Sequence, residues 1–171
     1  MPNSQLLLPD ARVHAALDEL AAPVETRYFI EGAPVPYDSS AYAVRGTRGS
    51  NPDTLPKGRL IFKPEVTHYG LVLVVEGLGS ADSANIDAAV LGFNLVDVNG
   101  QPALDVAQIQ GASGGYKELT PLRWDRVLLA EAIEFARANG LSAVNVVPSR
   151  SVLGGDDHNS ERLFKRYDQN A

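Results

Sequence analysis

A glycine-rich segment at residues 108–115 combines the residue types with the clearest capacity for binding a ligand. Its polar and small residues are Gln108, Gln110, Gly111, Ala112, Ser113, Gly114 and Gly115. Backbone N–H groups in such a loop, together with the positive end of a following helix, form a site for a phosphate or pyrophosphate group. The same glycines can also serve only to turn the chain between a strand and a helix.

Other motifs of ligand chemistry are missing from the sequence. The loop is not a Walker P-loop, because no Gly-Lys-Ser/Thr follows and Lys117 is displaced, and its glycine spacing differs from the Rossmann fingerprint. No Gly-x-Ser-x-Gly elbow supports a hydrolase triad. Three histidines and no cysteine argue against a multi-histidine or thiolate metal site, and residues 156–158 are predicted to cap a helix.

The composition is that of a globular protein of one ordinary domain. The chain has 171 residues, of which 44% are hydrophobic and 21% charged, and it contains no cysteine that could form a disulfide or act as a thiol catalyst. The formal net charge of −6 disfavours nucleic acids and anionic membranes as partners. The chain start has no basic segment, and no apolar run reaches the roughly 20 residues of a membrane span. We therefore expect a soluble, cytoplasmic protein.

Proline and glycine are concentrated in the first third of the chain, where we predict one helix and much loop. Asp10 can cap a helix whose apolar residues recur at helical spacing and which Pro23 ends. Its apolar stripe is Val13, Ala16, Leu17 and Leu20. Residues 25–30 are predicted to form a short strand. Residues 32–57 are predicted to form a long surface loop or arm, of the kind that often contacts a partner.

Regular structure is predicted to follow residue 64. Residues 68–76 form an apolar run of strand length, and residues 88–98 and 102–110 form a hairpin joined at Asn99-Gly100. A helix capped by Thr120, with Pro121 at its first position, ends at Asn139-Gly140. A short strand at residues 143–147 and a last helix through Tyr167 complete the order. We predict an α/β (α+β) fold with a mixed, mostly antiparallel central sheet flanked by helices, divided into an N-terminal part (1–64) and a core (65–171).

This order of elements and the segment from Gln108 to Ser113 resemble the GNAT family of N-acetyltransferases over residues 68–171. In that family a Gln/Arg-x-x-Gly-x-Gly/Ala loop and the following helix hold the pyrophosphate of acetyl-coenzyme A. The resemblance therefore implies acetyl-CoA as the cofactor, bound by the loop residues named above. It also implies that the strands at 103–110 and 143–147 splay apart to admit the pantetheine arm.

Acetyl transfer from a thioester to an amine needs a base for the amine and an acid for the departing thiolate. The candidate bases are Asp105 on the second hairpin strand, Asp97 near the hairpin tip, and Glu76. The resemblance assigns the late tyrosine, Tyr167, as the candidate acid. Each carboxylate can equally be a solvated surface group.

Two functions follow as hypotheses. The first is acyl-CoA-dependent N-acyl transfer to a small-molecule or peptide amine. The second is a non-enzymatic GNAT-like binding or assembly module whose 32–57 arm contacts a partner. The family's core usually continues into a final strand pair. Either this pair is missing from this sequence, or another segment or subunit supplies it, as in a homodimer that completes the sheet, or the domain is only GNAT-like.

Overall fold

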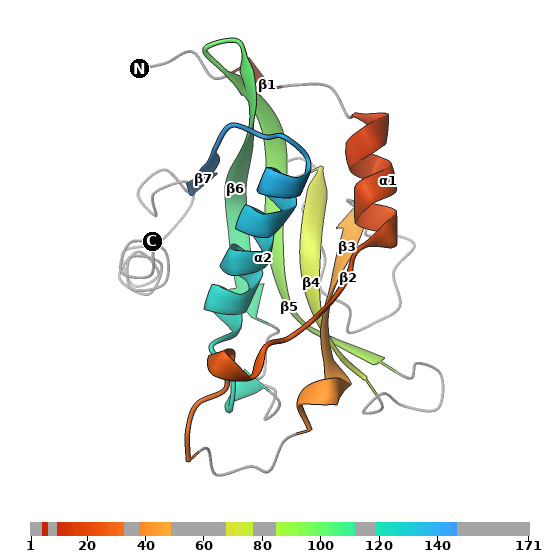
Figure 1. Ribbon diagram of the computed structural model, residues 1–171, viewed down its shortest axis with the longest axis vertical. Coiled ribbons are helices and arrows are strands. Elements are labelled where there is room, and N and C mark those ends of the chain that lie inside the picture. The colour runs from red at the N-terminus through yellow and green to blue at the C-terminus, as the bar shows by residue number, and fades with distance from the viewer. Residues whose placement is uncertain are drawn as a thin grey trace, which may run out of the picture.

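The computed structural model describes residues 5–6, 10–32, 38–48, 68–76, 85–111 and 119–146 (Figure 1). The elements in chain order are β1 (Gln5–Leu6), α1 (Ala11–Glu19), β2 (Ala21–Pro23), the 3-10 turns η1 (Thr26–Tyr28) and η2 (Ser39–Ala41), β3 (Tyr42–Arg48), β4 (Tyr69–Glu76), β5 (Asn85–Val98), β6 (Gln101–Gly111), α2 (Trp124–Ala138) and β7 (Val144–Val146). The last predicted helix, which contains Tyr167, lies outside the described residues, as do Ala112, Ser113, Gly114 and Gly115.

The described strands form one sheet in the order β2-β3-β4-β5-β6-β7, and β1 pairs with β5 beside this path. All pairs are antiparallel except β6 and β7, which run parallel and are connected through α2. The predicted fold class, a mixed and mostly antiparallel sheet with helices, is confirmed. Among the described helices, none is long and apolar enough to span a membrane.

The predicted hairpin is the longest pairing in the sheet. β5 and β6 pair from Val98↔Gln101 to Ala89↔Gly111, and the turn residues Asn99 and Gly100 have φ values of 56° and 79°. Such left-handed turn residues match the right-handed twist of paired strands. The Gly100 N–H donates to Asp97 Oδ1 over 2.8 Å, which fixes the turn further.

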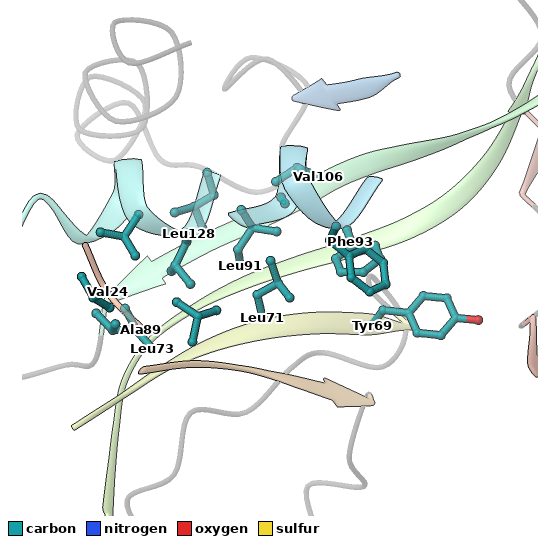
Figure 2. Packing of buried hydrophobic residues seen from close by; sticks show 14 of the residues in the cluster. Val24, Tyr69, Leu71, Leu73, Ala89, Leu91, Phe93, Val106 and Leu128 are labelled. Carbon is teal, nitrogen blue, oxygen red and sulfur yellow. The ribbon is translucent and has the colours of Figure 1, made fainter. Parts of the chain in front are cut away.

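Both helices pack on the same face of the sheet, and the main core lies between them and the strands (Figures 1 and 2). Leu71, Leu91 and Leu128 have no exposed side-chain surface in this layer. Aromatic rings extend the core from the sheet to α2: Tyr69 stacks on Phe93 at 5.5 Å, and Phe93 lies 5.9 Å from Phe135. Burial of such side chains contributes about 1.5–3 kcal/mol each.

Helix α1 forms where predicted. Asp10 caps it by accepting a hydrogen bond from the Arg12 backbone N–H at 2.7 Å, and Val13 and Leu17 are its buried residues. The backbone of Leu17 lies directly over Gly46 of β3. α1 is therefore seated on the sheet at a position where only glycine leaves enough space.

Two local predictions were wrong, and both errors arise at one contact. Within residues 25–30, Thr26–Tyr28 form η1 instead of a strand, and α2 begins at Trp124, with Arg123 as its N-cap, instead of at Pro121. The Ile30 N–H donates to the Pro121 carbonyl at 2.7 Å, and the Arg123 N–H donates to the Tyr28 carbonyl at 3.0 Å. These hydrogen bonds engage the backbone of residues 121–123, so the helix starts later.

The predicted 32–57 loop was also wrong in its middle. Residues 42–48 form β3, which pairs along its whole length with β4 and lies between β2 and β4. Tyr42 and Val44 are buried in the core, while Arg45 is exposed, as the two-residue period of a strand requires. The sheet therefore continues across the division that we predicted at residue 64.

Gly46→Ala should lower the free energy of unfolding by roughly 1–3 kcal/mol, because overpacking forces the backbone to shift. A Cβ at this position would lie 2.7 Å from Leu17 Cα and would contact the Leu17 carbonyl. Urea denaturation followed by circular dichroism measures the change. Thr47→Ala, on the next residue, serves as the control and should change stability much less. Equal stabilities of the two variants would contradict the close approach of α1.

Candidate functional site

Four polar residues lie side by side across the sheet, on or next to the neighbouring strands β4, β5, β6 and β7. Asn94 of β5 is directly opposite Asp105 of β6, and Asp105 is directly opposite Asn145 of β7. His68 immediately precedes β4, and its backbone N–H donates to Asn94 Oδ1 at 2.8 Å. We call His68, Asn94, Asp105 and Asn145 the polar row.

The polar row lies on the sheet face opposite the helices. Side chains of successive strand residues alternate between faces. Each member has neighbours that enter the helix-side core: Tyr69 follows His68, Phe93 precedes Asn94, and Leu104 and Val106 flank Asp105. Val144 and Val146, which also pack against that core, flank Asn145. The core thus fixes the direction of all four polar side chains.

Beside the polar row, two buried glycines are directly opposite each other. Gly70 pairs with Gly92, and Gly92 pairs with Gln108. Because glycine has no side chain, Gln108 is the one side chain at these three neighbouring positions, next to the polar row. Gly92↔Gln108 is followed by Phe93↔Val106, which leaves Ala107 as an extra residue in β6. Such a bulge re-aims the side chains around it and is frequent next to active sites. Because of it, Asp105 and Gln108 share one face.

Asp105 is a carboxylate that lies in a partly desolvated environment on the sheet. It is half-buried between two neutral asparagines, and burial raises the pKa of its carboxyl above the ordinary value. No described cation forms an ion pair with it. A half-buried carboxylate without a cation has a raised proton affinity, which suits a group that accepts a proton.

Two buried polar atoms near the polar row have no hydrogen-bond partner: His68 Nδ1 and Gln108 Oε1. The Gln108 amide nitrogen is engaged, because Nε2 donates to Gln110 Oε1 at 2.9 Å. An unsatisfied buried acceptor costs about 1–3 kcal/mol and requires an explanation. The Gln108 oxygen and the Asp105 carboxylate are both acceptors, so this face is suited to a ligand that presents N–H groups.

The structure places the predicted site residues in two groups. Asp105, Gln108 and Gln110 lie on one face of β6, while Gly111 ends the strand against α2, where an added Cβ would lie 3.2 Å from the Trp124 ring. The cofactor-binding predictions at residues 112–115 and the catalytic prediction at Tyr167 fall outside the described residues.

The other two candidate bases have structural partners. Asp97 accepts the turn hydrogen bond from Gly100, and Glu76 forms an ion pair of 2.6 Å with Arg45. Sequence reasoning did not identify His68, Asn94 or Asn145 as site residues. The signal for all three was a polar residue inside or directly beside an apolar strand run. Within the described part of the chain, no cluster of His, Asp and Glu is arranged to hold a metal ion.

Comparison with known proteins gives one distant similarity. No protein-family model matches the chain, and no curated protein matches it. Among solved structures, it is similar to the crystal structure of a probable acetyltransferase, with 11% sequence identity and a TM-score of 0.33. The alignment covers 56% of this chain and 56% of the other, so the chain spans just over half of that protein's length. This similarity is too distant to assign an activity.

Asp105→Asn should stabilise the protein at neutral pH. The raised pKa means that the folded state disfavours the charged carboxyl, so the penalty is present above the pKa and disappears as the pH falls through it. The gain in stability should therefore shrink towards acidic pH. Chemical denaturation at several pH values measures it, with Asp97→Asn as the control, which should not stabilise because Asp97 accepts the Gly100 hydrogen bond. Destabilisation by Asp105→Asn at neutral pH would contradict the assigned environment.

Proposed function

We propose that the protein is an acyl-coenzyme A-dependent N-acyltransferase that acts on a small-molecule or peptide amine. The observation that carries the proposal is the arrangement around β6. An antiparallel hairpin leads into β6, α2 follows, and β7 returns parallel to β6, while Asp105 and Gln108 share the face opposite the helices. This is the order of elements on which the resemblance to N-acetyltransferases rests.

An unpartnered hydrogen-bond acceptor on β6 supports the proposal that the pantetheine arm of acetyl-CoA binds there. That arm carries amide N–H groups, and Gln108 Oε1 is a buried acceptor without a partner on the same face of β6 as Asp105. β6 and β7 are paired in parallel from Leu104↔Val144 to Val106↔Val146, so over these described residues the two strands do not splay apart as the resemblance implies. When bound, the cofactor would supply an acyl group activated as a thioester.

The start of α2 fits a pyrophosphate less well than the resemblance implies. Asp125 places a carboxylate in the first turn of α2, and its Oδ1 accepts the Arg126 N–H at 2.9 Å. The backbone just before α2 is hydrogen-bonded to Tyr28 and Ile30. The proposed pyrophosphate contacts therefore rest on the N–H groups of residues 112–115.

Asp105 is proposed as the general base. Its half-buried carboxylate would accept the proton that the amine releases as the new C–N bond forms and the C–S bond breaks. The Asp105 backbone is held in place by β5 on one side and β7 on the other, which limits the motion of the carboxylate. Tyr167 remains the proposed acid for the departing thiolate.

Calorimetric titration with acetyl-CoA, followed by an acetylation assay on a panel of amines, tests this function. Asp105→Asn should retain acetyl-CoA binding and lose activity by about 10²-fold or more, because only proton transfer is removed. In the wild type, activity should fall as the pH drops through the raised pKa of Asp105. Gln108→Leu should weaken acetyl-CoA binding by roughly fivefold to tenfold, since one charge-neutral hydrogen bond is lost.

The matched control is Asp97→Asn, which removes a carboxylate on the same hairpin and should leave both binding and activity near wild-type values. Circular dichroism of each variant separates loss of function from loss of folding. Absence of binding at millimolar acetyl-CoA, in a protein that is folded, would overturn the proposal.

A further inference from the structure

A small cavity lies on the helix side of the molecule, between the segment that contains η1 and the outward face of α2. Its volume is about 170 Å³. Figure 1 shows η1 beside the first half of α2, and the polar row is on the opposite face of the sheet. The cavity is therefore separate from the proposed acyl-transfer site, and the inference below does not depend on that function.

The cavity walls are largely apolar. Val24 and Val127 are buried at its base, and the Ile133 side chain is 41% exposed at its rim, as one of two large hydrophobic side chains exposed in the described part of the chain. Tyr28 also lines it, with the Arg27 guanidinium 4.9 Å from the centre of its ring. Such walls can hold the methylene stem of a long side chain or of an alkyl ligand.

Negative charges outnumber positive charges in the lining of the cavity. Three carboxylates, those of Glu25, Glu131 and Glu134, line it. Arg27 pairs with Glu25, with Nε 2.7 Å from Oε2, and Arg137 pairs with Glu134. Glu131 is half-buried and forms no ion pair with any described cation.

Glu131 is in an unfavourable environment in the protein alone. Burial raises the pKa of its carboxyl first, and the negative charges of Glu134 and Glu25 raise it further. Among the described residues, Glu131 is thus the carboxylate lining this cavity that has no counter-ion. A single added cation would offset the repulsion from Glu134 and Glu25 and compensate the buried charge of Glu131, whereas an anion would add to the repulsion.

We propose that this cavity binds a primary alkylammonium group, with the alkyl stem against Val24, Val127 and Ile133 and the ammonium at the Glu131 carboxylate. An ammonium is a compact point charge, which fits a small cavity better than the planar fork of a guanidinium. The group belongs either to a lysine side chain of a peptide or to a free small amine, and the experiment distinguishes these sources.

NMR titrations of the wild-type protein with butylammonium chloride and with Nα-acetyl-lysine amide test the site. Both should shift the backbone amides of residues 24–28 and 127–134. Uncharged 1-butanol, the matched probe, should bind at least roughly tenfold more weakly, since it carries no positive charge to neutralise the Glu131 carboxylate. Tighter binding of the lysine derivative identifies a peptide lysine as the source, and equal or weaker binding identifies a free amine.

Glu131→Gln distinguishes a binding role of Glu131 from a purely structural one. It should weaken butylammonium binding by roughly tenfold and at the same time raise the melting temperature at neutral pH, because the desolvated charge is removed. The thermal gain should vanish as the pH falls through the pKa of Glu131. Glu19→Gln makes the same change on α1, outside the cavity, and should leave butylammonium binding unchanged. Equal binding of butanol and butylammonium, unchanged binding by Glu131→Gln, or a lower melting temperature of that variant would each overturn the proposal.

Discussion

The packing of the helices on one face of the sheet is the constraint on which the candidate site depends. Tyr69, Phe93 and Val106 are buried beneath α1 and α2, and their burial fixes the register of β4, β5 and β6. A shift by one residue in any of these strands would turn its apolar side chains away from the helices. For this reason Asn94 and Asp105 must point to the opposite face, where they form the polar row.

Two carboxylates in this protein are held where the folded chain alone does not favour their charge. Asp105 is desolvated on the sheet, and Glu131 is desolvated on α2 beside other acidic groups. Several other charged groups in the described chain differ from them because they form ion pairs, as Asp18 does with Arg48. Side chains whose environment destabilises the folded protein are often found at binding or catalytic sites. Asp105 on one face of the sheet and Glu131 on the other are therefore the carboxylates at the two proposed ligand sites.

Gly46 shows how β3, in the first third of the chain, forms part of the same sheet as the later strands. β3 was expected to be loop because proline and glycine surround it, yet it pairs fully with β4 and its Gly46 admits α1. Glycine in a strand marks close approach of another backbone as well as flexibility. Sequence composition gives the number of glycines in a segment but does not distinguish these uses.

The sequence alone determined the elements whose signals are local. Asp10 as a helix cap, the Asn99-Gly100 turn and the apolar run of β4 each depend on residues close in the chain, and all three formed as predicted. Only the tertiary structure decided the start of α2, the strand character of residues 42–48 and the assembly of the polar row. These depend on hydrogen bonds and registers between segments far apart in sequence, such as His68 with Asn94 and Asp105 with Asn145. The pattern of apolar residues within one segment does not predict which residues of a distant strand will pair with that segment.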